Sequence, residues 1–310
     1  PGCHTFAVSG PLLILDTATL YYRAFYALPQ KMTAPDGSPH NAVRGFLAML
    51  TKLIVIHRPS GLVAAWDNDW RPQWRVELLP SYKTHRVESD QGGEDAPDTL
   101  PPQIEAIAEI LDAFGIARAG VDGFEADDVI ASLTEQSGAR CLVVTSDRDL
   151  IQVVNERVSL VLQVSGGVEG WPILGPAAIE AKYGVCPADY LAMAALRGDP
   201  SDGLAGITGI GEKTACALVN EFGSLGSIMS AAAADTCARP LTPLLAQRIT
   251  SGGAYLESVL AVITAETRLP VHQWNVEIPY EPVDPQALET LAIRWGVEKN
   301  VAELLQAALG

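Results

Sequence analysis

Residues 123–149 read GFEADDVIASLTEQSGARCLVVTSDRD and combine a helix start with a buried strand. Apolar residues at helical spacing follow the first acidic group, and the apolar run CLVVT precedes the second. Because an open α/β sheet binds its ligands where strands end and helices begin, we expect the acidic side chains to face one crevice. Such a cluster repels itself unless protons or cations neutralise it, and oxygen ligands suit Mg²⁺ or Mn²⁺ better than zinc. The acidic residues are Glu125, Asp127, Asp128, Asp147 and Asp149.

Helix capping is the alternative explanation for these acids. An Asp at a helix start often caps the helix or interacts with the positive end of its dipole. For Asp127 or Asp147 taken alone, this is the favoured interpretation. Five carboxylates in one short stretch are harder to explain by capping, and they favour a cation site.

The composition is that of a folded protein without a membrane span. The chain has 310 residues, enough for one large or two medium domains, and 48% of them are hydrophobic. No apolar run approaches the roughly 18 residues of a transmembrane helix, and the first ten residues lack the pattern of a secretory signal. The five cysteines are odd in number and scattered, which argues against a zinc site and indicates a reducing compartment, the cytoplasm.

The formal net charge is −16, which argues against a polyanionic partner unless the acids bind metals and the bases are clustered. Bases do cluster between residues 71 and 86, at the start of a stretch, residues 71–102, in which apolar periodicity fails and which ends in an acidic, Gly/Pro-rich tail. Bases interleaved with aromatic rings suit a single-stranded nucleic acid, which needs charge for phosphates and rings for stacking. A solvated surface loop is the alternative. The residues concerned are Arg71, Trp74, Arg75, Tyr82, Lys83, His85 and Arg86.

The alternation of elements predicts the fold class. Strand and helix patterns alternate over residues 12–164, and two further strands end at acids, Asp16 and Asp67. This pattern predicts an α/β domain over residues 1–174, with a mostly parallel central sheet and helices on both faces. Strand signals disappear afterwards, so residues 175–310 are expected to form an all-helical domain.

Two motifs in the helical half carry chemistry. The first is GDPSDG, residues 198–203, which places Asp199 and Asp202 in a tight turn. The second is GITGIGEKT, residues 206–214, whose amides at the next helix start suit a phosphate, with Lys213 adding charge. A plain turn between helices is the alternative for the second motif. A Rossmann motif is excluded because no strand precedes it, and a Walker A motif because its spacing is absent.

In combination, these motifs resemble the 5′ nucleases, the flap endonuclease and 5′-to-3′ exonuclease family that includes the N-terminal domain of bacterial DNA polymerase I. The resemblance extends from Leu12 to about Leu305. It implies a PIN/resolvase-like sheet followed by a helix-hairpin-helix (H3TH) domain. It also implies a bacterial, nucleoid-associated monomer that acts on DNA with a 5′ flap or 5′ end, including RNA-DNA primer strands. No polymerase domain follows Gly310, so we expect either a stand-alone nuclease or an excised domain.

The resemblance assigns roles to individual residues. Two or more Mg²⁺ or Mn²⁺ ions would bind the carboxylates, and Lys83, Arg86, Arg23 and Tyr82 would act on the scissile phosphate and the 5′ strand. Residues 70–102 would form an arch over the site, with Arg71 and Arg75 contacting DNA. The hairpin would grip duplex DNA through Gly206, Gly209, Gly211, Lys213 and Thr214, and its backbone carbonyls would hold K⁺. The first metal site would comprise Asp16, Asp67, Glu125, Asp127 and Asp128, and the second Asp147, Asp149, Asp199 and Asp202.

Three positions depart from the family pattern. Gly203 stands where Asn is common, Ala205 where Pro is common, and Val76 where His is frequent. The first two lie next to Asp202, so they bear on the geometry of that turn.

The expected mechanism is phosphodiester hydrolysis with two metals about 4 Å apart. Three other functions compete with it. A non-catalytic nucleic-acid clamp would lack metal-dependent cleavage, and an endoribonuclease would lack the helical half. A small-molecule phosphatase would explain neither the arch nor the glycine-rich turn.

Overall fold

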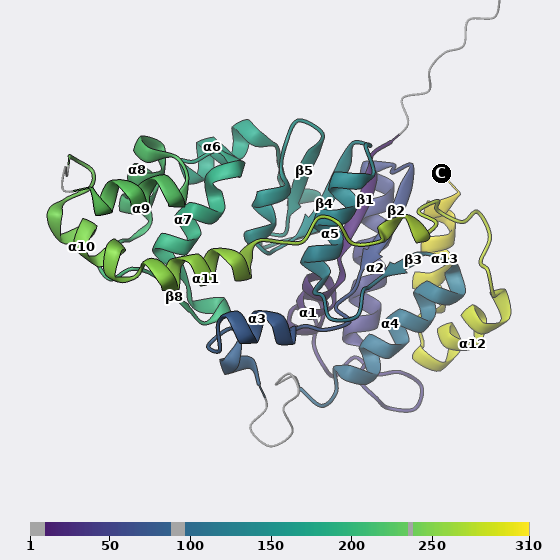
Figure 1. Ribbon diagram of the computed structural model, residues 1–310. Helices are drawn as coiled ribbons and strands as arrows, with labels where there is room; N and C mark the ends of the chain where they lie inside the picture. The colour runs from purple at the N-terminus through teal and green to yellow at the C-terminus, as the bar shows by residue number, and fades with distance from the viewer. Residues whose placement is uncertain (1–9, 88–96, 235–237, 310) are drawn as a thin grey trace, which may run out of the picture.

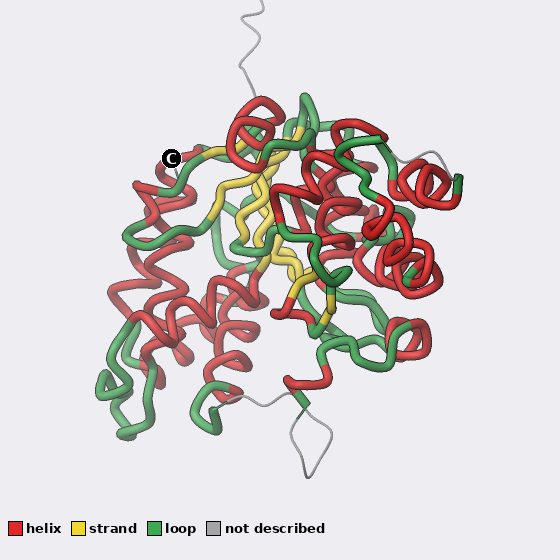
Figure 2. Tube along the Cα trace, turned by 90° about the vertical axis from the view of Figure 1, so that its left-hand side faces the viewer, coloured by secondary structure: helices red, strands yellow, loops and turns green. Residues whose placement is uncertain are grey.

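The computed structural model describes residues 10–87, 97–234 and 238–309. Its centre is a six-stranded sheet in the order β3-β2-β1-β4-β5-β6, parallel throughout except between β5 and β6. The strands run through the middle of the molecule with helices on both sides (Figures 1 and 2). The expected α/β fold is confirmed. The strands are β1 (Leu12–Asp16), β2 (Gly61–Ala65), β3 (Ala117–Ala119), β4 (Cys141–Thr145), β5 (Val158–Leu162) and β6 (Ile173–Leu174).

Both faces of the sheet are buried, which explains the continuous apolar runs of its strands. Leu12 and Ile14 of β1 join one core with helix α5 (Ala126–Gln136), whereas Leu13 and Leu15 join a second core on the other face. The second core includes α1 (Thr17–Ala27), α2 (Asn41–His57) and α4 (Pro101–Phe114).

The last two helices return to this second core. They are α12 (Pro285–Trp295) and α13 (Glu298–Ala308), which pack on α4 and α2 beside the sheet (Figure 1). Residues 264–284 lead to them across α5, where Ser132 Oγ donates to the Glu266 carbonyl at 2.9 Å. The segment 175–310, expected to form one helical domain, is therefore divided between two parts of the molecule.

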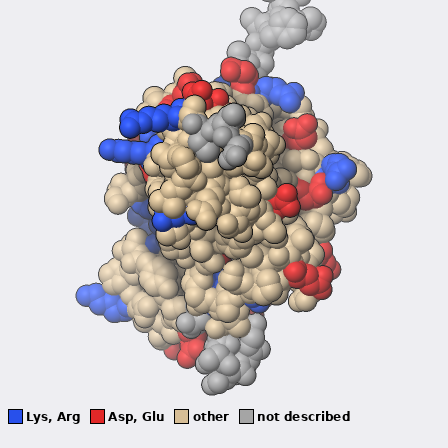
Figure 3. Space-filling model, turned by 60° about the vertical axis from the view of Figure 1, so that its left-hand side comes forward, with Lys and Arg blue, Asp and Glu red and all other residues tan. Residues whose placement is uncertain are grey.

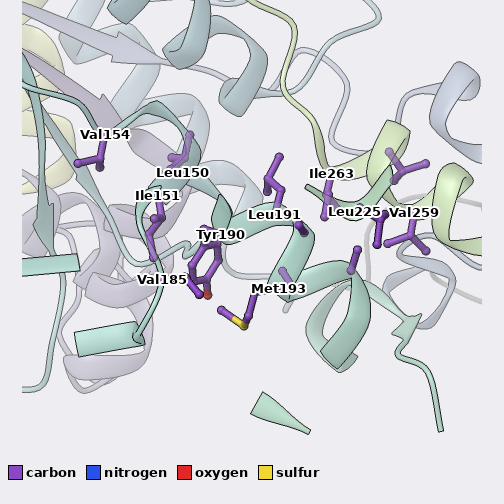
Figure 4. Close-up of a cluster of buried hydrophobic side chains, with 14 of the residues drawn as sticks. Leu150, Ile151, Val154, Val185, Tyr190, Leu191, Met193, Leu225, Val259 and Ile263 are labelled. Carbon is purple, nitrogen blue, oxygen red and sulfur yellow. The ribbon is translucent and has the colours of Figure 1, made fainter. Parts of the chain in front are cut away.

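The rest of the second half is a helical unit beside the carboxyl ends of β4 and β5. A shared apolar cluster joins it to the α/β part, with Leu150 and Ile151 on one side and Val185, Tyr190 and Leu191 on the other (Figure 4). The helices are α6 (Pro176–Tyr183), α7 (Tyr190–Arg197), α8 (Glu212–Phe222), α9 (Leu225–Ala233), α10 (Pro243–Ser251) and α11 (Gly253–Ile263).

Short elements complete the fold. The expected arch is represented by α3 (Gln73–Leu78) and the 3₁₀ turn η1 (Thr84–Arg86), and its residues 88–96 lie outside the described part. Within the described residues, no helix has both the length and the apolar character needed to cross a bilayer. The remaining elements are η2 (Asp149–Val153), η3 (Val168–Gly170), η4 (Pro187–Asp189), β7 (Gly198–Asp199), η5 (Pro200–Asp202), β8 (Leu204–Ala205) and η6 (Val271–Gln273).

Candidate active site

The strand order reverses beside β1, whose neighbours β2 and β4 continue the chain in opposite directions. This switch point is where open α/β sheets bind ligands. A cavity of about 930 Å³ opens there, at the carboxyl ends of the strands. The residues that line it include six of the nine expected metal ligands and three of the four expected catalytic residues. These are Asp16, Asp67, Glu125, Asp127, Asp147 and Asp199, with Arg23, Lys83 and Arg86.

Asp16 is the buried last residue of β1. Its Oδ2 accepts a 2.6 Å hydrogen bond from Thr145 Oγ1 at the end of β4. Burial, together with the nearby carboxylates Asp67 and Asp147, raises the pKa of Asp16 to about 7, although the Thr145 hydrogen bond offsets part of the effect. A cation nearby would therefore favour the ionised carboxylate at neutral pH.

Asp147 stands between two groups of acids. The protein raises the pKa of Asp127 well above its ordinary value by desolvation and by the charges of Asp147 and Asp16. Burial and the charge of Asp147 do the same for Asp149, with Asp202 and Asp199 adding to the effect. Asp147 therefore lies close to members of both ligand sets that the resemblance implies.

Capping accounts for part of the acidic motif at α5. Glu125 is the N-cap residue and forms a capping box with Asp128, and Asp67 Oδ1 accepts a 2.8 Å hydrogen bond from the Ala126 amide. Asp127 lines the cavity instead. The capping alternative thus describes Glu125, Asp128 and Asp67. Of the two acids for which it is favoured, Asp127 lines the cavity, and Asp147 Oδ1 accepts the Asp149 amide at 2.8 Å.

Arg75 and Asp128 occupy a different place from the one expected. Both are buried, and the Arg75 guanidinium donates two hydrogen bonds of 2.8 Å to the two Asp128 oxygens. Arg75 also binds Glu125 and the Val262 carbonyl, and Asp128 Oδ1 accepts the Glu266 amide. Neither side chain lines the cavity. We therefore revise both assignments: Arg75 is too buried to contact DNA, and Asp128 already has its oxygens occupied by protein donors.

Lys83 and Tyr82 converge on Glu125. The Lys83 ammonium and the Tyr82 hydroxyl both donate to its carboxylate, Tyr82 at 2.9 Å to Oε2. Burial lowers the pKa of Lys83, but the surrounding negative charges of Glu125 and Asp202 help to hold it well above its ordinary value. Lys83 is therefore a protonated group on the wall of the cavity, whereas Tyr82 is buried behind it.

Arg23 of α1 reaches the cavity from the opposite wall. Its Nη2 donates to the carbonyls of Val164 and Gly166, the latter at 3.0 Å, and its guanidinium lies 5.1 Å from the centre of the Trp171 ring. No sequence motif indicated Trp171, because it contacts Arg23 only through the fold. Gln163 lines the cavity without any sequence signal, whereas Thr145 and Arg148 lie within the stretch 123–149, although no role was expected for them.

Three of the expected acids remain to be placed: Asp199 and Asp202, at the turn η5, and Asp149. Asp199 Oδ1 accepts the Ser201 amide at 2.8 Å and lines the cavity, whereas Asp202 is buried and binds Arg86 at 2.9 Å. Asp149 is buried as well and does not line the cavity. Arg71, expected to contact DNA, donates from Nε to the Tyr82 carbonyl at 2.7 Å and so supports the base of the arch.

The three glycines of the glycine-rich turn have different structural roles. At Gly206 a Cβ would overlap the Arg197 backbone, so this glycine is required for packing. Gly209 has φ 85°, and Gly211 is the N-cap residue of α8 with open space around it. Gly209, Gly211 and Lys213 are exposed, whereas Thr214 is partly buried. The backbone amides at the start of α8 are thus presented to solvent.

Arg248 of α10 is an additional basic residue at this turn. Its Nη1 donates to the Thr208 carbonyl at 2.7 Å. No local sequence pattern indicates this contact, because forty residues separate the two partners. On the face shown in Figure 3, basic side chains stand mainly along the left edge and acidic ones mainly along the right.

The donor set fits hard divalent cations. Among the described residues, no group of three or more Asp, Glu, His or Cys side chains is arranged to hold a metal ion by itself. The carboxylates that surround the cavity instead leave room for water, and Mg²⁺ typically keeps several waters while using few protein carboxylates and substrate phosphates. The raised pKa of Asp16 and Asp127 supports the same conclusion, because a cation would relieve that repulsion.

Comparisons with known proteins agree with this site. A family model described as "5'-3' exonuclease, N-terminal resolvase-like domain" matches residues 11–184, and one described as "5'-3' exonuclease, C-terminal SAM fold" matches residues 185–286. A Streptomyces coelicolor protein named 5'-3' exonuclease is 48% identical over 298 residues, which cover 94% of this chain and 98% of the relative.

Two solved structures share the fold at low sequence identity. T5 5'-exonuclease with bound divalent metal ions (zinc) has a TM-score of 0.62 and 17% identity, covering 96% of this chain and 99% of the other. The catalytic core of Rad2 in complex with DNA substrate has a TM-score of 0.64 and 16% identity, covering 97% and 93%. With both family models matched along one chain, the protein belongs to the 5'-3' exonuclease family.

Proposed function

We propose that this protein is a metal-dependent DNA hydrolase with 5′-to-3′ exonuclease and 5′-flap endonuclease activity. The observation that carries the proposal is the single cavity at the sheet's switch point, where six carboxylates face three bases. The family membership and the structural likeness to T5 5'-exonuclease and Rad2 support it.

Mg²⁺ or Mn²⁺ is the proposed cofactor. Asp16, Asp67, Glu125 and Asp127 would hold one ion, and Asp147, Asp149, Asp199 and Asp202 another, some of them through water. When bound, such ions supply a water that is nucleophilic near neutral pH and neutralise charge on the leaving oxygen. The backbone at residue 149 helps to orient Asp147, since the Asp149 amide donates to Asp147 Oδ1 at 2.8 Å.

The bases hold the scissile phosphate. Lys83, Arg86 and Arg23 line the same cavity, and charge-assisted hydrogen bonds from them would orient a phosphodiester there. To bind the phosphate, the Lys83 ammonium must give up part of its contact with the Glu125 carboxylate. Tyr82 orients Glu125 from behind.

The glycine-rich turn would grip the duplex next to the cleaved strand. The exposed residues Gly209 and Gly211 offer backbone amides to DNA phosphates, and Lys213 adds a positive charge. Contacts to phosphates do not depend on the base sequence, as expected for an enzyme that recognises DNA structure. Arg248 already binds the Thr208 carbonyl, so the K⁺ ion proposed for this turn would have to use other carbonyls. The proposed setting is a monomer at the bacterial nucleoid that removes flaps and RNA-DNA primer strands during replication and repair.

The decisive experiment is cleavage of a 5′-labelled flap duplex with Mg²⁺, Mn²⁺ or EDTA. A matched single strand and an RNA of the same sequence serve as comparisons. Metal-dependent cutting near the flap junction is the expected result. Tight binding without cutting in any metal would contradict the proposal and favour the non-catalytic clamp, whereas preferential cutting of the RNA would favour the endoribonuclease.

A further inference from the structure

The base of the arch is attached to the turn that precedes the glycine-rich hairpin. The Lys83 amide donates to the Asp202 carbonyl at 3.0 Å. Arg86 Nη2 donates to the Ser201 carbonyl at 2.7 Å and to Asp202 Oδ1 at 2.9 Å. Both basic residues line the cavity, so the segment that carries them is held by η5.

Gly203 permits this close approach. Its φ is 71°, and a Cβ built on it would lie 2.8 Å from the Ser81 carbonyl oxygen and 3.4 Å from His85 Nδ1. The nearest atom belongs to the backbone, so rotation of a side chain cannot relieve the overlap. Any other residue at position 203 therefore forces the turn and the arch base apart.

Lys83 depends on the same contact for its backbone conformation. It has φ 50°, one of two positive values found among the described residues other than glycine. A left-handed conformation is unfavourable for a side chain such as lysine, and it persists where the surroundings impose it. The hydrogen bond from the Lys83 amide to Asp202 is one such restraint, and this conformation accompanies the contact of Nζ with Glu125.

We propose that Gly203 is a positioning residue for catalysis, because it lets η5 dock on the arch base and hold Lys83 and Arg86 over the carboxylates. The inference rests on the proposed function, in which these two bases hold the scissile phosphate. Because Asn is common at this position in the family, the close approach of η5 and the arch base is proposed for this chain alone. This approach also connects the hairpin to the cleft, since β8 alone separates Gly203 from residue 206.

The test compares three variants: Gly203→Ala, Gly203→Asn and the matched control Gly138→Ala. Gly138 also has positive φ, 63°, but its added Cβ would meet no atom within 4 Å. The two alanine variants thus share the backbone strain, and Asn tolerates positive φ better while still carrying the Cβ. Thermal unfolding, kcat and KM are measured on the flap duplex at saturating Mg²⁺.

We expect both alanine variants to unfold at a lower temperature than the wild type. Only the two Gly203 variants should lose kcat, by about tenfold or more, since small misplacements of positioned groups are costly. Their KM should stay within about threefold of the wild type, because the hairpin is unchanged and supplies most duplex contacts. If Gly203→Ala does not fold, Gly203→Asn still tests the effect of an added Cβ, with less backbone strain.

A double-mutant cycle separates positioning from a general structural effect. If Gly203 acts through the bases, Gly203→Ala should lower kcat much less in an Arg86→Ala background than in the wild type. An undiminished loss in that background, or a wild-type kcat in both Gly203 variants, would overturn the inference. A wild-type protein that cuts no substrate in Mg²⁺ or Mn²⁺ would instead contradict the proposed function itself.

Discussion

Thr145 Oγ1 donates a 2.6 Å hydrogen bond to Asp16 Oδ2 and so joins the carboxyl ends of β1 and β4. The same hydroxyl accepts the Asp147 amide at 2.8 Å. One side chain thereby orients an acid from each of the two proposed metal sites. It also lowers the pKa of Asp16, against the effect of burial.

Thr145→Val should weaken metal binding. The valine keeps the shape of threonine but leaves the ionised Asp16 without its donor, and a hydrogen bond to a charged group contributes about 1.5–3 kcal/mol. The Mg²⁺ concentration that gives half-maximal cleavage should therefore rise at least about tenfold. Thr145→Ser retains the hydroxyl and should resemble the wild type. Equal Mg²⁺ requirements for the valine and serine variants would contradict this role.

The metal-free protein should lose stability as the pH rises from about 4 to about 7. Burial raises the pKa of Asp16 to about 7, so the folded state binds its proton more tightly than the unfolded state throughout this interval. Unfolding in EDTA should thus require less urea at pH 7 than at pH 5, and Mg²⁺ should restore stability at pH 7. Asp16→Asn removes the titrating group, so its stability should depend less on pH. A wild-type slope in that variant would assign the effect to other groups.

Neighbouring residues Asp127 and Asp128 should respond in opposite ways to the same substitution. Asp127→Asn removes a repelling charge from the cavity, so we expect lost turnover with unchanged or increased thermal stability. Asp128→Asn breaks a buried pair with Arg75, which costs about 3–5 kcal/mol. Thermal unfolding and the cleavage rate, measured on both variants, distinguish the roles. An Asp128→Asn variant as stable as the wild type would restore the metal assignment for this residue.

Arg248→Ala should weaken duplex binding. The substitution removes a charge beside the hairpin and leaves the Thr208 carbonyl without its donor. We expect the Kd for a flap duplex to rise several-fold and the salt dependence of binding to decrease by about one phosphate contact. Lys213→Ala should have a similar effect on the salt dependence. Fluorescence anisotropy in Ca²⁺, without cleavage, measures both, and an unchanged salt slope for Arg248→Ala would show that this side chain contacts no phosphate.

The sheet and most of the cavity could be predicted from the sequence, because apolar runs ending in acids mark the carboxyl edge of a parallel sheet. The pairing of Arg75 with Asp128 could not, since the two lie 53 positions apart and no local pattern connects them. Successive residues on a helix point about 100° apart. Asp127 and Asp128 are thus alike in sequence, yet one faces the cavity and the other the junction with residue 266.

The position of α12 and α13 could not be predicted from the sequence, for a related reason. The amphipathic patterns of α12 and α13 predict helices, but a pattern does not say which apolar surface a helix covers. Trp295 and Leu304 pack in the core beside α2 rather than with α8 to α11. The strand β3 was also missed, because its three residues, Ala117–Ala119, are too short for a periodic signal.

The return of α12 and α13 makes the helical unit an insertion within the α/β domain. The chain leaves that domain after β6 and comes back along residues 264–284, where the Leu62 amide binds the Val276 carbonyl at 2.7 Å and the Asp284 amide binds the Ala113 carbonyl at 2.9 Å. A unit joined to the rest of the molecule by two chain connections has less rotational freedom than a unit joined by a single linker. Under the proposed function, DNA held by the hairpin would be presented to the cleft along a restricted arc, and we expect reproducible cutting positions rather than broad sampling of the strand.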